Sequence, residues 1–291
     1  MSGGIAVVRE PDALRARIDA WKREGLRIGF VPTMGNLHEG HYSLVRLARA
    51  NADRVVASVF VNPTQFGPGE DYERYPRTPD ADVAGLAGVG CDLAWMPSLD
   101  AMYPLGLARA VRVQVPGITG VLDGAHRPGH FDGVCTVVAR LFNQVRPDVA
   151  VFGRKDYQQR AVIRHMVRDL AFPIELLGAD IVREGDGLAR SSRNQYLSAE
   201  ERALAPEIHR SLLAMRGAVQ GGQDWREAEA AAAARLQAAG FVVDYAVLRT
   251  PLLVEPPASS APGDDGQRVA LVAARLGRTR LIDNLEFSLN G

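Results

Sequence analysis

The sequence has few cysteines and no excess of charge of either sign. Cys91 and Cys135 lie far apart in 291 residues, so neither a disulfide framework nor a structural zinc site is indicated. Lys plus Arg and Asp plus Glu are balanced at 34 each, which leaves no chain-wide basic surplus for binding nucleic acid or an anionic membrane. We therefore expect a protein of the reducing cytoplasm whose phosphate sites, if any, are local.

Long hydrophobic runs are also missing. No stretch of about 18 apolar residues occurs, and the first fourteen residues carry charges early without a long apolar core. We expect a chain that is neither secreted nor membrane-spanning. Hydrophobic residues make up 47% and charged residues 23%, which is typical of a globular protein. The length predicts one large domain with a smaller appendage, or two unequal domains.

The first two thirds of the chain alternate β-rich runs with helical patterns, which is typical of βαβ units and a parallel sheet. Two helices are marked by apolar residues at steps of three and four, at 134–145 and 163–170, and a shorter pattern at Leu44, Leu47 and Ala48 marks another. The predicted strands are 27–31, 54–61, 149–152 and 174–177. Residues 1–183 are therefore predicted to form a Rossmann-like, doubly wound α/β domain.

A polar, glycine-containing stretch at 183–189 marks the predicted domain boundary. Beyond it, Ser198 and Glu201 have the spacing of a capping box, and an alanine-rich helix at 225–239 ends at Gly240. Two further strands are predicted at 242–248 and 269–275, separated by a loop at 255–266 that is rich in Pro, Ser, Gly and Asp. Residues 184–291 are thus predicted to form a smaller α+β domain.

The first strand runs into PTMGNLHEGH, where His38 and His41 directly precede a helix. Ligands of open α/β sheets bind at the carboxyl ends of strands, and a helix N-terminus favours phosphate. Imidazoles there can donate hydrogen bonds to phosphate oxygens, and Gly40 allows close approach of a nucleotide. His-x-Gly-His is expected by chance about 0.01 times in a chain of this composition. The alternative is a pair of solvent-exposed or capping histidines at a turn.

Two other clusters follow predicted strands. Asn62 and Gln65 in NPTQFG offer amides that can bind a carboxylate or hydroxyl without adding charge, although an ordinary Asn-Pro turn is the alternative. Lys155 and Gln159 in GRKDYQQ open a helix after the strand at 149–152. A phosphate-binding lysine is one interpretation, and a charged surface helix start is the other.

Two polar segments complete the candidate site. The stretch RSSRN at 190–194 brings two hydroxyls and two guanidiniums that suit a triphosphate, or forms a plain polar loop. A loop predicted at 124–133 contributes Arg127 and His130, which could line an acid-binding pocket or belong to a surface turn.

Taken in order, these segments resemble the pantothenate synthetase (pantoate–β-alanine ligase) family, in the nucleotidylyl transferase superfamily with the HxGH site. The resemblance extends from PTMGNLHEGH through FVNPTQFGPGEDYERYPRTPDAD, GRKDYQQ and SSRNQYLS to VAARLGRTRLIDN. It implies an ATP-dependent ligase that activates pantoate as an adenylate and passes it to β-alanine, with Mg²⁺ and a homodimer. The metal ligands are not identified by any motif.

The resemblance also implies roles for individual residues. His38, His41 and Lys155 would be catalytic, with His41 as proton donor. Gln65 and Gln159 would bind pantoate, with Asn62 and His130 nearby, and Gln65 would also meet β-alanine. The implied ATP site comprises Met34, Gly35, Asn36, Leu37, His38, Glu39, Gly40, His41, Gly153, Arg154, Lys155, Asp156, Val182, Arg190, Ser191, Ser192 and Arg193.

Two positions depart from the family pattern. Arg154 stands where Glu is common, and Arg190 where an apolar residue is usual, so both are expected to add positive charge beside the triphosphate. Other classes remain open. A nucleotidylyltransferase that releases only diphosphate is the main alternative, followed by a non-catalytic nucleotide-binding protein. A tRNA synthetase is disfavoured by the short chain and the balanced charge.

Overall fold

A computed structural model describes residues 5–257 and 264–289 of the chain. The predictions that concern residues 1–4 and 258–263 lie outside the described residues. The chain divides into two compact units, one of residues 1–154 and 158–180 and the other of residues 155–157 and 181–291. The segment at 183–189 lies inside the second unit, where Arg183 and Ala189 form an isolated antiparallel bridge.

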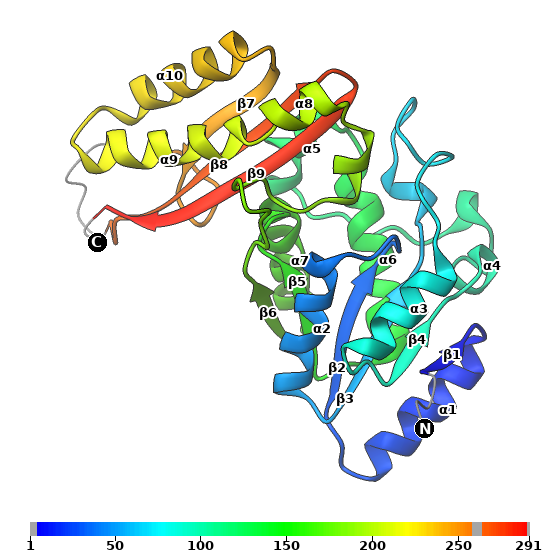
Figure 1. Cartoon of the computed structure of the whole chain (residues 1–291). Coiled ribbons are helices and arrows are strands. Elements are labelled where there is room, and N and C mark those ends of the chain that lie inside the picture. Colours follow the sequence, from blue (N-terminus) through cyan, green and yellow to red (C-terminus); the bar gives the residue numbers. More distant parts are fainter. Residues whose placement is uncertain (1–4, 258–263, 290–291) are drawn as a thin grey trace. The chain divides into compact units, whose positions relative to one another are not determined.

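The first unit is built on a six-stranded sheet in the order β1-β4-β3-β2-β5-β6, in which all the paired strands are parallel (Figure 1). The strands are β1 (Ala6–Val8), β2 (Ile28–Thr33), β3 (Arg54–Val59), β4 (Leu93–Trp95), β5 (Val149–Gly153) and β6 (Glu175–Ala179). The chain adds β3 and β4 on one side of β2 and then returns to add β5 on the other. The strand order therefore reverses between β2 and β5, which is where open α/β sheets bind their ligands.

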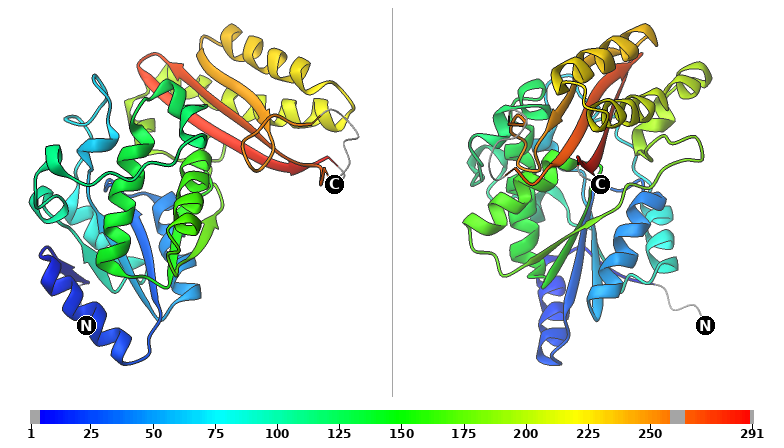
Figure 2. Two further views of the ribbon diagram at one scale, coloured as in Figure 1. Left: turned by 180° about the vertical axis from the view of Figure 1, so that it is seen from behind. Right: turned by 90° about the vertical axis from the view of Figure 1, so that its left-hand side faces the viewer.

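Helices cover both faces of this sheet. They are α1 (Pro11–Arg23), α2 (Glu39–Asn51), α3 (Pro79–Gly88), α6 (His130–Val145) and α7 (Tyr157–Asp169), with short turns α4 (Leu99–Met102), α5 (Asp123–His126), η1 (Pro63–Gln65), η2 (Leu107–Arg109) and η3 (Ile118–Gly120). The right-hand view of Figure 2 shows α2 and α3 on one side of the strands and α6 on the other. The predicted doubly wound α/β fold is confirmed.

Alternation along the strands produces two cores, because successive strand residues point to opposite faces. Phe30 and Val56 pack in the layer that contains α1, α6 and α7, whereas Val31 and Ala57 pack against α2 and α3. All four side chains are fully buried. A shift of either strand by one residue would move its side chains to the opposite faces of the sheet. The hydrophobic pattern therefore fixes the register that places the ends of β2 and β3 side by side.

The second unit is an antiparallel sheet in the order β7-β8-β9, packed on two helices. Its elements are η4 (Ser192–Tyr196), α8 (Ala199–Leu204), α9 (Glu207–Gln220), α10 (Trp225–Ala238), β7 (Val242–Arg249), β8 (Gln267–Leu276) and β9 (Thr279–Ser288). The predicted capping box is present, because Ser198 N donates to Glu201 Oε2 at 2.8 Å and Glu201 N donates to Ser198 Oγ at 3.1 Å. Strand β9 was not predicted.

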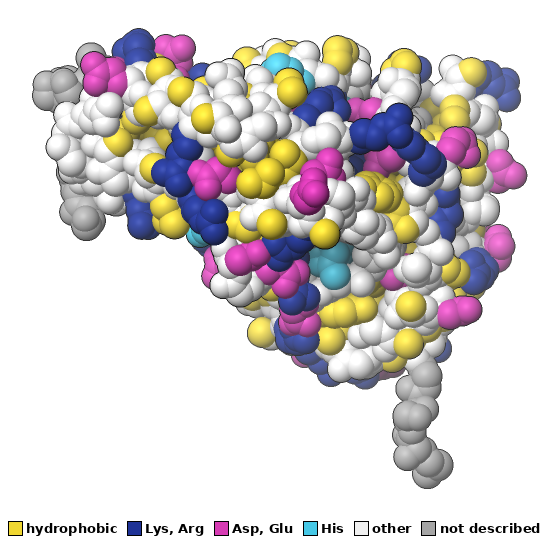
Figure 3. All heavy atoms as spheres, turned by 45° about the horizontal axis from the view of Figure 1, so that its top comes forward, with side chains coloured by type: hydrophobic (Ala, Val, Ile, Leu, Met, Phe, Trp, Pro, Cys, Tyr) yellow, Lys and Arg dark blue, Asp and Glu magenta, His cyan; other side chains and the backbone are white. Residues whose placement is uncertain are grey.

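Three features of the sequence, namely the cysteines, the charge balance and the lack of long apolar runs, can each be followed in the structure. Cys91 and Cys135 are both unbridged and buried, and burial raises the pKa of each thiol to about 12, so neither is a reactive thiolate at neutral pH. Basic and acidic side chains are interspersed over the face shown in Figure 3. Within the parts of the chain that the structure describes, none of the helices has the length and apolarity needed to cross a bilayer.

Candidate active site

The turn after β2 depends on a left-handed glycine. Gly35 has a φ of +86°, and a Cβ at this position would lie only 3.0 Å from Asp82 Oδ2 and from Val59 Cγ1. Thr33 supports the same turn, because its Oγ1 donates to the main-chain oxygen of Ser58 at 2.6 Å and accepts from Gly35 N at 3.3 Å. A side chain at residue 35 would therefore be strained and crowded.

Asp82, from α3, holds the next two residues of this turn. Its Oδ2 accepts from Asn36 N at 3.0 Å and its Oδ1 accepts from Leu37 N at 2.8 Å. Thr78 Oγ1 also donates to Oδ1, at 3.1 Å. The carboxylate is 2% exposed, so these are buried, charge-assisted bonds. Asp82 was not predicted from the sequence, because it lies more than 40 residues from the turn that it supports.

His38 and His41 cap the N-terminus of α2 reciprocally. His38 Nδ1 accepts from Gly40 N at 3.1 Å, and His41 Nδ1 accepts from His38 N at 3.3 Å. The ring centroids are 4.2 Å apart. A Cβ on Gly40 would lie 2.8 Å from the His38 ring, so this position also requires glycine. The capping role considered from the sequence is therefore correct for the Nδ1 atom of each ring.

The other edge of each ring follows from the caps. A neutral imidazole whose Nδ1 accepts a hydrogen bond carries its proton on Nε2. Both rings are thereby fixed as Nε2–H donors at the first turn of α2, where the helix dipole favours an anion. The caps and a phosphate-binding role are thus compatible, since each uses a different nitrogen.

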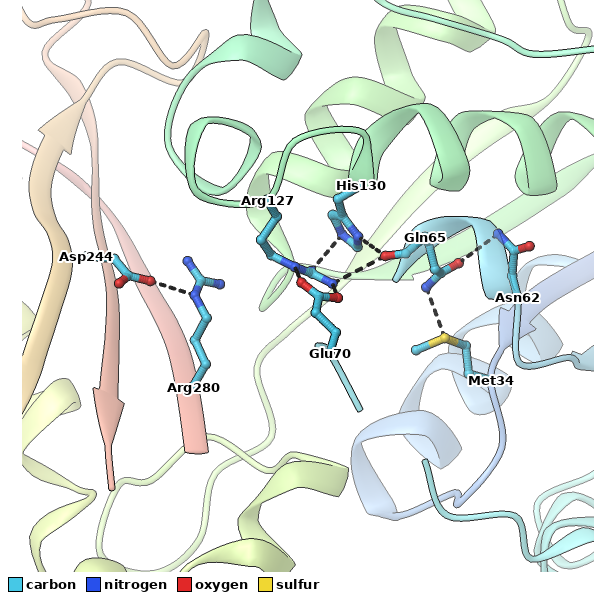
Figure 4. Close-up of polar contacts among 8 residues, drawn as sticks. All are labelled: Met34, Asn62, Gln65, Glu70, Arg127, His130, Asp244 and Arg280. Atoms are coloured by element: carbon cyan, nitrogen blue, oxygen red, sulfur yellow. Dashed lines mark hydrogen bonds and ion pairs between the residues drawn. The ribbon is translucent and has the colours of Figure 1, made fainter. Parts of the chain in front are cut away.

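The turn at Asn62–Gln65 follows β3, next to β2 in the sheet. Asn62 Nδ2 donates to Gln65 Oε1 at 3.3 Å and to the main-chain oxygen of Gly133 at 3.2 Å, while Tyr103 Oη donates to Asn62 Oδ1 at 2.7 Å. Gln65 Nε2 lies 2.9 Å from Met34 Sδ. The structure thus brings together Met34, Asn62 and Gln65, as Figure 4 shows.

His130 is the first residue of α6 and contacts the same turn. Its Nδ1 is 2.7 Å from the main-chain oxygen of Gln65, and its Nε2 is 2.9 Å from Arg127 Nη1 (Figure 4). Burial, together with the adjacent Arg127 charge, lowers the pKa of His130 to about 4, so the ring is neutral at physiological pH. The predicted loop at 124–133 is wrong in part, because α5 ends at His126 and α6 begins at His130.

Strand β5, which pairs with β2, ends at Gly153, and Arg154 follows it with its N–H donating to Ala179 O of β6 at 2.9 Å. In α7 the two adjacent glutamines differ. Gln158 is buried, with its Oε1 accepting from Asp123 N at 2.9 Å and its Nε2 donating to Ile118 O at 2.7 Å. Gln159 is half-buried on a different side of the helix. Gln158 is therefore committed to the packing of the 118–123 segment, and the predicted site residue Gln159 is the more exposed of the two glutamines.

Lys155 and Asp156 belong to the second compact unit. Asn284 of β9 donates from Nδ2 to the main-chain oxygen of Lys155 at 2.8 Å. This bond fixes the peptide that carries the lysine. Asn284 was also missed in the sequence, although it ends the VAARLGRTRLIDN stretch, to which no role had been given.

Neighbouring residues of the second unit form a compact arrangement around Val182. Arg190 N donates to Val182 O at 2.9 Å. Arg183 makes a bidentate pair with the buried Asp283, at 2.6 and 3.0 Å. Asp283 directly precedes Asn284, so the middle of β9 anchors both the Val182 segment and the Lys155 peptide. Figure 4 also shows Arg280 of β9 paired with Asp244 of β7, at 2.7 Å.

The RSSRN stretch forms a capped 3-10 turn. Ser191 Oγ accepts from Arg193 N at 3.2 Å, and η4 follows. Ser192 and Arg193 are the first two residues of η4.

The two departures from the family pattern are both paired. Arg154 Nη1 lies 3.3 Å from Asp180 Oδ1, and Arg190 Nη2 lies 3.1 Å from Glu184 Oε2. The positive charge that each arginine adds is therefore partly compensated within its own unit. Among the described residues, no group of three or more His, Cys, Asp or Glu side chains is arranged to hold a metal ion.

Comparison with known proteins identifies the relatives. The sequence model of the Pantoate-beta-alanine ligase family matches residues 6–286. The chain is 68% identical to the pantothenate synthetase of Stenotrophomonas maltophilia (strain K279a) and 65% identical to that of Xanthomonas axonopodis pv. citri (strain 306), with 97% of this chain and 100% of each relative covered.

Solved structures show the same relationship. The crystal structure of pantothenate synthetase from Thermus thermophilus has a TM-score of 0.89 at 50% identity, with 97% of this chain and 99% of that chain covered. The structure of pantoate-beta-alanine ligase from Francisella tularensis, complexed with beta-gamma ATP and beta-alanine, has a TM-score of 0.78 at 29% identity, with 99% and 98% covered.

Proposed function

Because the chain belongs to the pantoate–β-alanine ligase family, whose members are ligases that form C–N bonds, we propose that it condenses pantoate with β-alanine through a pantoyl-adenylate. ATP is consumed, and AMP and diphosphate are released with pantothenate. The observation that carries this mechanism is the reciprocal capping of α2 by His38 and His41, which fixes two Nε2–H donors at a helix N-terminus beside the strand-order reversal.

Activation is required because a carboxylate is a poor acylating agent. Its carbonyl is resonance-stabilised, and oxide would have to leave. In the first step a pantoate carboxylate oxygen attacks the α-phosphorus of ATP, and the bond to the bridging oxygen of diphosphate breaks. Negative charge moves onto the departing diphosphate. His38 and His41 stabilise that charge through hydrogen bonds donated from Nε2–H, and the Nε2–H of His41 occupies the proton-donor position that the family resemblance implies.

The turn 34–37 holds the nucleotide next to these imidazoles. Gly35 and Gly40 have no side chain to cover the backbone there. A Cβ at either position would also collide with the neighbouring residues. The rest of the ATP site comes from Gly153, Arg154, Lys155, Asp156, Val182, Arg190, Ser191, Ser192 and Arg193. Lys155 is the charge partner of the phosphates, and the hydroxyls of Ser191 and Ser192 add neutral donors.

Pantoate binds to the amides of Gln65 and Gln159, with Asn62 and His130 beside them. Amides recognise the hydroxyl and carboxylate groups of pantoate without creating a general anion site. In the second step the neutral amine of β-alanine, held near Gln65, attacks the pantoyl carbonyl carbon. The C–O bond to AMP breaks, and the amine proton passes to solvent or to the departing phosphate. Residues 184–291 close over the adenylate and keep water away from it.

Mg²⁺ enters as the counter-ion of ATP, bound to phosphates and water. No described set of carboxylates fits a resident metal, so no step is assigned to the ion. We further propose that the enzyme works in the cytoplasm, which the buried, unbridged cysteines support. A homodimer is proposed from the family resemblance alone.

The test is a product analysis. Enzyme with ATP, Mg²⁺ and pantoate, followed by β-alanine, is expected to release AMP and pantothenate in equal amounts. A stable adenylylated product that persists after β-alanine is added would favour a nucleotidylyltransferase and contradict the proposal. ATP binding without any turnover would indicate a non-catalytic nucleotide-binding protein.

A further inference from the structure

The turn that carries Gln65 is held from outside by an ion pair that the mechanism above does not use. Glu70 lies in the segment after η1, and Arg127 lies between α5 and α6. Arg127 Nε donates to Glu70 Oε1 at 2.7 Å, and Arg127 Nη2 donates to Glu70 Oε2 at 2.6 Å. The Glu70 side chain is only 26% exposed and the Arg127 side chain only 16%. A bidentate pair of this kind has a defined geometry as well as a favourable energy.

The remaining donors of Arg127 point to Gln65 and its support. Arg127 Nη2 is 3.4 Å from the main-chain oxygen of Gln65, and Arg127 Nη1 is 2.9 Å from His130 Nε2. Figure 4 shows the guanidinium between the Glu70 carboxylate on one side and His130 and Gln65 on the other. The guanidinium charge is therefore balanced by Glu70, and three of its nitrogens are engaged within the protein.

His130 transmits this arrangement to Gln65. A carbonyl oxygen can only accept, so His130 Nδ1 carries the proton and donates to Gln65 O at 2.7 Å. His130 Nε2 is then the acceptor for Arg127. Both ring nitrogens are occupied, and the ring has no further N–H to offer a substrate. Its effect on the acid site must therefore pass through the Gln65 peptide.

The Gln65 side chain is itself held at both ends of its amide. Oε1 accepts from Asn62, and Nε2 lies against Met34 Sδ. On the opposite side of the turn, α6 packs so closely that a Cβ on Gly133 would lie 2.2 Å from the main-chain oxygen of Thr64. The peptide oxygen of Gln65 is bonded to His130 and Arg127, and these bonds also hold its orientation.

We propose that Glu70 and Arg127 are positioning residues for pantoate: their ion pair, acting through His130, holds the Gln65 peptide so that its amide meets the acid. The inference rests on the proposed role of Gln65. Glu70 has a second effect in the same arrangement, since it prevents Arg127 from acting as an independent anion site next to the amides.

The experiment measures steady-state kinetics of AMP release with Glu70→Gln, Arg127→Gln and the double variant. Each single variant is expected to lower kcat/KM for pantoate by roughly ten- to hundredfold, the range of a lost charge-assisted pair, with KM for ATP within about twofold of wild type. In the double variant, kcat/KM for pantoate is expected to be no lower than in the more impaired of the two single variants, because the two side chains act as a unit.

Glu73→Gln is the matched control, since Glu73 is an exposed glutamate in the same segment and should leave both kinetic constants unchanged. If Glu70→Gln fails to fold by thermal melting, Glu70→Asp keeps the charge and is expected to give an intermediate loss. A merely structural role would lower kcat without a selective rise in KM for pantoate, and that result overturns the inference. A lower KM for pantoate in Glu70→Gln also overturns it, because Arg127 would then be a direct ligand restrained by Glu70.

Gln65→Ala, assayed in parallel, separates this inference from the function on which it rests. If Gln65→Ala leaves KM for pantoate unchanged, the proposed role of Gln65 is wrong. If Gln65→Ala raises KM for pantoate and neither Glu70→Gln nor Arg127→Gln does, only the positioning role fails.

Discussion

Asp82→Asn removes a buried negative charge at nearly constant side-chain size, and it tests how the nucleotide turn is held. The wild-type carboxylate accepts from Asn36 N, Leu37 N and Thr78 Oγ1. In asparagine one of the two oxygens becomes an NH₂ group, which is a donor. At least one main-chain N–H of the turn then faces a donor and loses its partner, in a site that is 2% exposed in the wild type.

The expected cost follows from these bonds. A buried donor left without a partner costs about 1–3 kcal/mol, and the bond that remains loses the contribution of the charge. We expect the free energy of unfolding to fall by about 2–4 kcal/mol in total. Because the lost bonds hold the turn that we propose to bind ATP, KM for ATP should rise by about tenfold or more, at 1.4 kcal/mol per factor of ten.

The assay is urea unfolding of the protein without nucleotide, followed by kinetics with ATP as the varied substrate. Asp80→Asn is the control, because Asp80 is exposed in the first turn of the same helix and bonds nothing in the turn. An unfolding free energy of Asp82→Asn within about 0.5 kcal/mol of wild type, together with an unchanged KM for ATP, would refute the positioning role of this carboxylate.

Three further predictions concern single side chains. The pKa of His130 is about 4 in the folded chain and ordinarily about 6.5, so between these pH values the unfolded chain binds a proton that the folded chain does not. The free energy of unfolding should therefore fall by about 3 kcal/mol as the pH drops from 6.5 to 4. In His130→Asn, denaturation measured over the same pH range should lack this component. His41→Ala should lower turnover by about two to four orders of magnitude with an unchanged circular dichroism spectrum, whereas a near-normal rate would remove His41 from the mechanism. Asn284→Ala should release the Lys155 peptide and raise KM for ATP while leaving KM for pantoate unchanged, and equal effects on both would contradict that role.

Much of the fold was predictable because its signals are local. Strands β2 and β3 are mostly apolar along their length, and α6 shows its buried face at steps of three and four. Strands β1 and β4 have only three residues each, too few to show a pattern. Strand β9 was missed because charged residues such as Arg280, Asp283 and Glu286 interrupt its apolar positions, and the first two of these are paired with residues of distant segments.

The candidate site divides in the same way. His38 and His41 were identified because the motif itself is local and improbable, and even their capping role was foreseen as an alternative. Asp82, Glu70 and Asn284 were not assigned roles, because each acts on a partner 45 to 129 residues away, as the bonds Asp82–Leu37, Glu70–Arg127 and Asn284–Lys155 show. A single sequence contains no signal for such pairs, and only the folded chain brings them together.

In the proposed mechanism the pantoate carboxylate attacks the α-phosphorus of ATP at the His38–His41 site. The most direct test uses pantoate labelled with ¹⁸O in both carboxylate oxygens, with ATP, Mg²⁺ and β-alanine, and mass spectrometry of the products. We expect one ¹⁸O to appear in AMP and the other to remain in pantothenate. Label in inorganic phosphate, with ADP as the other product, would place the attack on the γ-phosphorus and contradict the account.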